Sequence, residues 1–440
     1  MNKTVAAFVC GFACTAMAQI GDYMGPGVMS NGAGTIGQRS GEQLDLRFYA
    51  AAMGVYDNGI EPFALKDGQL YTVNGLYGEQ VSAGIYGQHT WKQALLGLDI
   101  SGNYYHYDND SQFDSSSAYL GLGYTYQKSR RLLFTLRGTA GTSTYGYGEG
   151  GYYEGPVPGQ LVGQQSALLF NNRIFYLQGG AQMTYLFSPR TSLTVGGQGF
   201  TSQYQAAALI GVYGYNLSAT LQHRLTRRTT VGATYQRMQF DFVKSYGYSS
   251  LNVAQLFYAT ALGKRWTLAL NAGAFQSQVQ GIQQISLNPV IAALLGQSFG
   301  YQTFQVTDYY PSGNVRLTGK FKTSELTFSY MKFVAPGNGI YLTSREDTAG
   351  ASYSYTGIRK WNFGASGNYY RLNSLGQSLA PYSTYGGGAG FTYNLARAFH
   401  VVARYDYRRQ DIVAVGFRRD ASRVTAGLAW SPGDVPLSLW

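Results

Sequence analysis

The sequence predicts an all-β fold, a transmembrane antiparallel up-and-down β-barrel of about 18 strands, with 16 strands as the alternative. Apolar and polar residues alternate along segments, these segments recur as hairpins, and the composition fits neither a soluble domain nor a helical membrane protein. The last hairpin shows the alternation most clearly. The apolar face of its first segment carries Phe399, Val401, Ala403, Tyr405 and Tyr407. The polar face carries His400, Val402, Arg404, Asp406 and Arg408. Charges in the middle of one face are typical of a membrane strand around a water-filled lumen.

Residues 1–18 are predicted to be a secretory signal peptide. Lys3 precedes an apolar segment, which ends in the small-residue cleavage site Ala16-Met17-Ala18. Both cysteines of the chain, Cys10 and Cys14, lie in this segment. The mature chain is therefore expected to lack disulfides and any catalytic or metal site built on cysteine.

The composition restricts the class of protein. Charged residues make up 12% of the chain, whereas about 25% is usual in soluble domains. Tyrosine (39 residues) and glycine (58 residues) are abundant, and no apolar run after residue 18 reaches the roughly 18 residues that a membrane helix needs. An exported chain of this kind is either an outer-membrane β-barrel or a secreted all-β protein such as a propeller.

The predicted barrel covers residues 44–430, between a flexible periplasmic lead-in at 19–43 and a short tail at 431–440. Most of its tight basic turns are about 37 residues apart, which fits two strands of about ten residues, a short turn and a moderate loop. Two longer intervals are expected to hold long external loops at 145–173 and 281–312. The turns are Trp91-Lys92-Gln93, Lys128-Ser129-Arg130-Arg131, Ser188-Pro189-Arg190, Thr226-Arg227-Arg228, Gly263-Lys264-Arg265, Lys320-Phe321-Lys322, Ile358-Arg359-Lys360 and Ala396-Arg397-Ala398. They delimit about nine hairpins, hence about 18 strands.

Propeller blades repeat with a similar period, so the spacing alone does not decide between the two classes. Short turns, however, alternate with longer polar loops, and aromatic residues gather towards strand ends, as at the two interfaces of a membrane. No blade signature recurs along the chain. These observations favour the barrel.

Two segments fit the pattern poorly. In residues 231–244 the apolar phase changes between Tyr235 and Met238, which predicts a β-bulge. In residues 251–262 the two faces are hard to tell apart because both are apolar.

The formal net charge of the chain is +11, and many basic residues lie in or beside the short turns. There they are expected to contact lipid headgroups and solubilise the periplasmic rim. Nucleic-acid binding is not indicated, since the basic residues are spread around this rim and no reader motif appears.

Eight charged residues on polar strand faces are predicted to line the pore: Arg47, Asp99, Arg137, Arg316, Arg404, Asp406, Arg408 and Arg423. Closure of a barrel places the last strand beside the first, so Arg47, Arg404, Arg408 and Arg423 are expected to share one wall. Two interpretations remain open. The wall could attract anionic solutes, as rings of basic side chains do in anion pores, or the charges could pair across strands and stiffen the seam.

A candidate constriction lies in the predicted loop 281–312. Asn288 as a cap, Pro289 at the first helical position and the apolar pair Leu294 and Leu295 predict a short helix. A second candidate is the segment 164–170. Either segment could narrow the pore or only cover its rim.

The sequence indicates neither an enzyme nor a cofactor. His89, His106, His223 and His400 lie on separate predicted strands, and no metal-binding spacing is present. No plug domain precedes the first predicted strand, which counts against a plugged transporter.

The alternating segments from Leu44 to Trp430 resemble the outer-membrane β-barrel porin families of Gram-negative bacteria. The resemblance is one of pattern, without a diagnostic motif. It departs from the usual form at the end, where Trp430, with apolar residues two and four positions earlier, fits the closing aromatic better than Trp440 does.

The resemblance implies a location in the bacterial outer membrane, with lipids and the assembly machinery of that membrane as partners. It also implies passive passage of hydrophilic and, on the first interpretation of the arginine wall, anionic solutes. The alternatives are a conduit for polysaccharide export and a structural or adhesive barrel. A homo-oligomer is left open, because alternation does not distinguish a subunit interface from a lipid-facing wall.

Overall fold

The computed structural model describes residues 43–58, 64–66, 69–71, 75–108, 113–144, 173–207, 209–243, 246–286, 296–336, 339, 342–375, 379–412 and 417–432. The predicted signal peptide and most of the predicted lead-in and tail lie outside these residues. Within them, no helix is long and apolar enough to cross a membrane.

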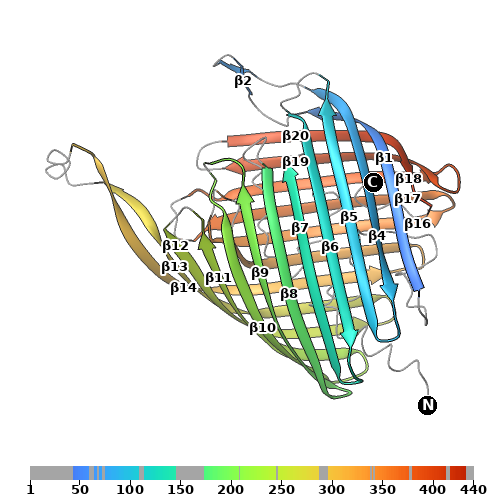
Figure 1. Cartoon of the computed structure of the whole chain (residues 1–440), viewed down its shortest axis with the longest axis horizontal. Helices are drawn as coiled ribbons and strands as arrows, with labels where there is room; N and C mark the ends of the chain where they lie inside the picture. Colours follow the sequence, from blue (N-terminus) through green and yellow to red (C-terminus); the bar gives the residue numbers. More distant parts are fainter. Residues whose placement is uncertain are drawn as a thin grey trace.

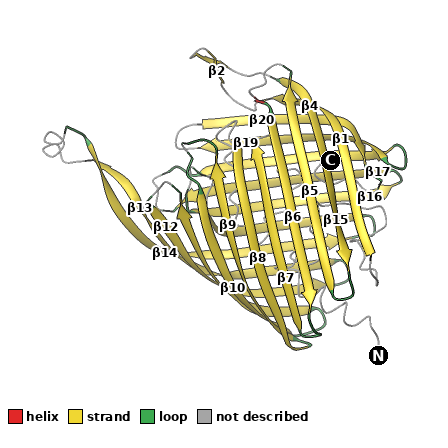
Figure 2. Ribbon diagram, viewed as in Figure 1, coloured by secondary structure: helices red, strands yellow, loops and turns green. Residues whose placement is uncertain are grey.

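Eighteen strands form one closed antiparallel sheet, so the predicted fold class is confirmed, with 18 strands and not 16. Each strand pairs with its neighbours in the sequence, and β1 closes the ring by pairing with β20. Figures 1 and 2 show the resulting barrel. The strands of the first half are β1 (Gln43–Asn58), β4 (Leu76–Thr90), β5 (Ala94–Tyr107), β6 (Ser115–Gln127), β7 (Leu132–Thr144), β8 (Arg173–Ser188), β9 (Thr191–Tyr204), β10 (Val212–Arg224) and β11 (Thr229–Phe242).

The strands of the second half are β12 (Gly247–Leu262), β13 (Trp266–Ser286), β14 (Phe299–Lys320), β15 (Ser324–Ala335), β16 (Ser344–Ile358), β17 (Trp361–Ser374), β18 (Tyr382–Asn394), β19 (Phe399–Ile412) and β20 (Phe417–Trp430). A separate two-stranded hairpin, β2 (Ala64–Lys66) and β3 (Gln69–Tyr71), lies in the connection between β1 and β4. Because the main sheet closes on itself, each strand is paired on both sides within the ring, as a membrane interior demands; residues 299–312 of β14 extend beyond this ring and pair only with β13.

The connections differ between the two ends of the barrel. At one end, here the turn end, all the predicted basic turns join consecutive strands, as Arg359 and Lys360 join β16 to β17. Lys360 (φ 69°) and Gly263 (φ 74°) adopt the left-handed conformation that such tight turns use. The longer connections lie at the other end, here the loop end. In barrels of this type the short turns face the periplasm and the longer loops face outward.

The outward face of the barrel is apolar. On β1 and β20, Leu46, Phe48 and Leu428 are 42–52% exposed, whereas Tyr49, which points inward, is 5% exposed. Exposed aromatic side chains gather at both ends of this face: Phe187, Phe399 and Trp430 at the turn end, and Tyr77, Tyr104 and Tyr213 at the loop end. An apolar band between two aromatic belts matches a hydrocarbon layer between two interfaces.

The structure corrects two predictions about strands. Most of the range 281–312, expected to be a loop, is strand, because β13 extends to Ser286 and β14 begins at Phe299. Glutamine and threonine on both faces of these extensions concealed the alternation. The predicted bulge in β11 is also wrong, because β11 pairs with β10 and β12 without a register shift.

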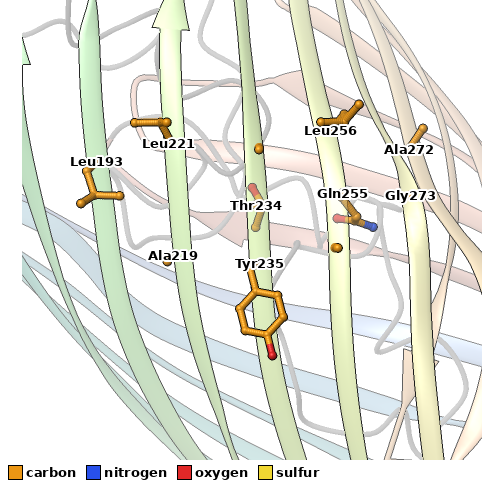
Figure 3. Close-up of a pocket in the computed structure, with 11 residues that line it drawn as sticks. Leu193, Ala219, Leu221, Thr234, Tyr235, Gln255, Leu256, Ala272 and Gly273 are labelled. Atoms are coloured by element: carbon orange, nitrogen blue, oxygen red, sulfur yellow. The ribbon is translucent and has the colours of Figure 1, made fainter.

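A shallow hollow of about 450 Å³ lies in the outer wall between β9 and β13 (Figure 3). Small outward-facing residues, among them Ala219, Ala233 and Ala272, form its floor, and Leu221 and Leu256 border it. The hollow belongs to the apolar band and not to the lumen, since Leu256 is 71% exposed on the outward face.

Candidate functional site: the inner wall of the barrel

The inward-facing side chains form two regions of opposite character. An ionic network lies at the closing seam and reaches from β19 and β20 across β1 and β4 to β5. An apolar cluster covers the inner wall of β9 to β13 near the loop end.

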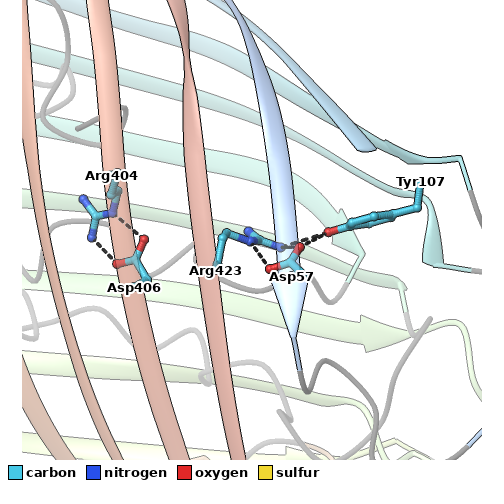
Figure 4. A network of polar contacts seen from close by, with 5 residues as sticks. All are labelled: Asp57, Tyr107, Arg404, Asp406 and Arg423. Atoms are coloured by element: carbon cyan, nitrogen blue, oxygen red, sulfur yellow. Dashed lines mark hydrogen bonds and ion pairs between the residues drawn. The ribbon is translucent and has the colours of Figure 1, made fainter. Parts of the chain in front are cut away.

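Asp57 and Arg423 form a buried ion pair across the closing seam (Figure 4). They are direct partners in the β1–β20 ladder, on the inward side of both strands. Arg423 Nε lies 2.7 Å from Asp57 Oδ1 and Arg423 Nη2 lies 2.9 Å from Asp57 Oδ2, a bidentate geometry. Asp57 is 1% exposed and Arg423 is 2% exposed, so the pair is shielded from water.

Two tyrosines of β5 complete this network. The Tyr107 hydroxyl donates a hydrogen bond to Asp57 Oδ2 and accepts one from Arg423 Nη2 at 3.1 Å. Arg423 Cζ lies 4.8 Å from the centre of the Tyr105 ring. Tyr107 reaches across β4 at Gly78, its direct ladder partner, which has no side chain in the way. The network therefore ties the first, last and third strands of the barrel together.

A second ion pair lies within β19. Arg404 Nε and Nη2 each lie 2.6 Å from a carboxylate oxygen of Asp406, two residues along on the same face. Gly388 of β18 lies directly opposite Asp406, and a Cβ at Gly388 would be 2.2 Å from Asp406 Oδ1. The glycine run 386–388 thus leaves room for the ion pair.

The structure brings together six of the eight predicted pore-lining residues. Arg47 and Asp99 flank Tyr86 in one row across β1, β4 and β5. The other four lie on β19 and β20, where Arg408 pairs with Gly386 and Ala421 in the two ladders. Arg137 on β7 and Arg316 on β14 lie on distant parts of the wall. All eight have interaction partners.

The sequence analysis missed two charged residues of the seam. Asp57 ends an inward face that is otherwise apolar, with Ala51, Met53 and Val55 all 4% exposed, so nothing in its alternation marked it as an ion-pair partner. Arg419 is 7% exposed and pairs with Gln410 in the β19–β20 ladder. It lies beyond the segment whose alternation was clear.

The apolar cluster explains why the apolar residues of β11 change phase between Tyr235 and Met238. Met238 and Phe240 are fully buried and point inward, whereas Tyr235, on the other phase, points outward and is 51% exposed. The phase change was therefore a signal that the inner wall becomes apolar. The buried members of the cluster are Phe200, Val212, Met238, Phe240, Phe242, Leu251, Val253, Phe275, Val279, Val334 and Leu375.

An inward-facing side chain of a wide barrel is exposed to the lumen unless another part of the chain covers it. Described residues of two connections at the loop end form part of the cover: Ile210, between β9 and β10, and Gly339 and Leu342, between β15 and β16 (the 336–343 connection). The backbone N–H of Ile210 donates to the carbonyl oxygen of Gly339 at 3.1 Å. Leu342 and Ile210 also pack against the cluster.

The 336–343 connection is fixed at two further points. The hydroxyls of Thr343 and Ser249 form a hydrogen bond, which ties the connection to the inner face of β12. The carbonyl oxygen of Thr343 accepts a hydrogen bond from the N–H of Leu375 at 2.8 Å. The described residues Gly339, Leu342 and Thr343 of this connection therefore lie on the inner side of the wall at the loop end.

The residues predicted to form a constriction, Asn288, Pro289, Leu294 and Leu295, lie outside the described residues, as does the segment 164–170. The described ends of β13 and β14 that lead to the first of these segments run away from the barrel (Figure 1). In the described part of the chain, no group of three or more histidine, cysteine, aspartate or glutamate side chains could hold a metal ion.

These features define the class of protein: a closed 18-stranded transmembrane β-barrel with an ionic seam and a partly filled loop end. No protein-family model matches the chain, and no curated protein matches it.

Several solved structures are similar to the chain at low identity. Pseudomonas aeruginosa OccK2 (OpdF) in complex with glucuronate is 12% identical, with a TM-score of 0.43 over 89% of this chain and 100% of that chain. A BenF-like porin from Pseudomonas fluorescens is 11% identical, with a TM-score of 0.42 over 89% and 99%. Pseudomonas aeruginosa OpdK with vanillate is 13% identical, with a TM-score of 0.42 over 88% and 99%. The assignment of the fold rests on the chain's own strand pairing.

Proposed function

We propose that the protein is an outer-membrane channel for the passive passage of hydrophilic solutes, with a preference for anionic ones. A barrel of 16–18 strands encloses an aqueous channel rather than a filled core. The apolar outer face and its two aromatic belts support a location in a bilayer whose lipids surround the barrel.

The distribution of charge at the seam carries the preference for anions. Among the described inward-facing side chains of β19, β20 and β1, five are arginines and two are aspartates. The arginines are Arg47, Arg404, Arg408, Arg419 and Arg423, and the aspartates are Asp57 and Asp406. Arg423 and Arg404 are neutralised by these aspartates, so they hold the wall rigid. Five arginines against two aspartates give these described side chains a positive net charge, and fixed basic groups along a pore favour anions.

The 336–343 connection is proposed to narrow the passage at the loop end. Its described residues Leu342 and Thr343 contact the wall opposite the seam, since β9 to β13 and β19 to β1 occupy different sides of the ring. A solute would then pass along the arginine wall rather than through the centre of a round pore. Proximity to fixed charge strengthens its influence on the solute, because Coulomb energy rises as the distance falls.

Replacing Arg408 by glutamine tests this proposal. Arg408 is opposite Gly386 and Ala421, which have little side chain, so glutamine fits without displacing a neighbour. We expect proteoliposomes that contain the variant to take up glucuronate several-fold more slowly than those with the unchanged protein, while uptake of glucose is nearly unchanged.

Arg371, on the outward-facing phase of β17, offers the matched control, because Arg371→Gln removes the same charge outside the lumen. Equal uptake of glucuronate and glucose by the unchanged protein would contradict the proposed preference. If Arg371→Gln lowered glucuronate uptake as much as Arg408→Gln does, the net charge of the protein, and not the position of Arg408 in the lumen, would be responsible for the anion preference.

A further inference from the structure

β14 has a long free edge. It pairs with β13 from Phe299, opposite Ser286, to Gly319, opposite Trp266. On its other side, β15 pairs with β14 only between Gly313 and Lys320. Within the described part of the chain, the segment 299–312 therefore has a strand partner on one side only. Figure 1 shows the β13–β14 hairpin standing clear of the neighbouring strands at the loop end.

The backbone of this segment is available for pairing. In an antiparallel strand, successive residues direct their N–H and C=O groups alternately to the two sides. About half of the backbone groups of residues 299–312 therefore point away from β13. Pro311 is the only residue of the segment that lacks an N–H group. An extended polypeptide satisfies such a row of donors and acceptors by adding as a further strand.

The edge also lacks the features that normally protect a free strand. Proteins protect edges with lysines, bulges, inward-pointing charges or very short strands. Residues 299–312 contain no basic residue and one acidic residue, Asp308, and their pairing with β13 has no register shift. Tyr301 and Tyr309 are each 71% exposed. A long aromatic edge with a single charged residue, exposed to water, is more consistent with a binding surface than with a protected edge.

We propose that the β14 edge is a strand-addition site outside the membrane, whose occupant is an extended, uncharged segment of another polypeptide. The strand that β14 already pairs with shows the side chains that suit it. Gln276, Gln278 and Gln280 of β13 lie directly across from Tyr309, Thr307 and Gln305. The Gln276 amide donates to the Tyr309 hydroxyl at 2.8 Å. A partner strand with glutamine or serine at alternate positions could make the same contacts on the free side.

A synthetic peptide with the sequence of residues 274–286 serves as the test ligand for the whole barrel in lipid nanodiscs. We expect saturable binding of the labelled peptide to the unchanged protein, measured by fluorescence anisotropy. Thr307→Lys places a charge beside the free edge and is expected to weaken binding roughly tenfold or more.

Gln278→Lys is the matched control, because Gln278 is the ladder partner of Thr307 on the strand away from the free edge. It should bind the peptide as the unchanged protein does. Absence of saturable binding, or equal binding by the Thr307→Lys variant, would overturn the proposal. In a third outcome, the unchanged barrel forms dimers that persist in the presence of the peptide and are lost in the Thr307→Lys variant. That result would identify a second copy of the chain as the occupant, which also overturns the proposal.

Discussion

Replacing Asp57 by alanine is expected to destabilise the folded barrel by about 3–5 kcal/mol, the usual cost of removing one partner of a buried ion pair. Arg423 would lose its bidentate carboxylate, while the Tyr105 ring and the Tyr107 hydroxyl carry no negative charge. Asp406, the ladder partner of Arg423 on β19, already forms an ion pair with Arg404. The guanidinium is 2% exposed, so water cannot replace the lost carboxylate. Urea unfolding of the barrel in lipid vesicles measures the change in the free energy of unfolding.

An exposed ion pair provides the control for this prediction. Lys320 Nζ lies 3.7 Å from Glu325 Oε2, and the two side chains are 59% and 43% exposed. Glu325→Ala should therefore lower the free energy of unfolding by less than about 1 kcal/mol. The double variant Asp57→Ala/Arg423→Met removes both charges and should recover much of the stability lost in the single variant. If Asp57→Ala cost no more than Glu325→Ala, the seam network would not brace the barrel.

Replacing residues 336–343 by a short glycine–serine turn is expected to raise the single-channel conductance several-fold. Leu342 of this connection packs against the apolar cluster that includes Met238 and Phe240, so removal of the connection is expected to expose that part of the inner wall to water. Because exposing apolar side chains costs roughly 25 cal/mol per Å², some loss of stability should accompany the wider pore. Single-channel recordings in planar bilayers measure the conductance.

Deletion of residues 64–71 is the matched control, since the β2–β3 hairpin stands away from strands β9 to β13, which carry most of the inner apolar cluster (Figure 1). It should change the conductance little. A disulfide between Cys introduced at Ser249 and Thr343, whose hydroxyls hydrogen-bond, would hold the connection in place. Conductance should be unchanged by this disulfide, because the connection is proposed as a fixed constriction. Unchanged conductance after replacement of residues 336–343 would show that the connection does not narrow the pore.

The strand number and the closing seam could be predicted from the sequence because both depend on local patterns. The alternation of Phe399 to Arg408 defines one strand, and the regular basic turns count the rest. Closure then follows, since a membrane barrel can leave no open edge. The Asp57–Arg423 pair could not be predicted, because its partners are 366 residues apart and depend on the register of β1 against β20.

The apolar cluster shows a different limit of sequence reasoning. The phase change between Tyr235 and Met238 was visible, but alternation alone cannot separate a bulge from a wall that changes character. A bulge would shift the register, so that the side chains after it point to the opposite face. In β11 the register is continuous, and apolar residues occupy outward-facing positions up to Tyr235 and inward-facing positions from Met238 onward. Which connection covers such a wall depends on contacts such as Ile210 to Gly339, between segments distant in the sequence.

The reversal potential of the reconstituted protein in a potassium chloride gradient measures the ion preference of the barrel. The seam arginines predict a conducting channel whose reversal potential lies between zero and the chloride equilibrium potential. The displacement from zero should become smaller at high salt, because salt screens the fixed charges. An absence of conductance, or a reversal potential that indicates preference for potassium, would contradict the account of this barrel as an anion-preferring channel.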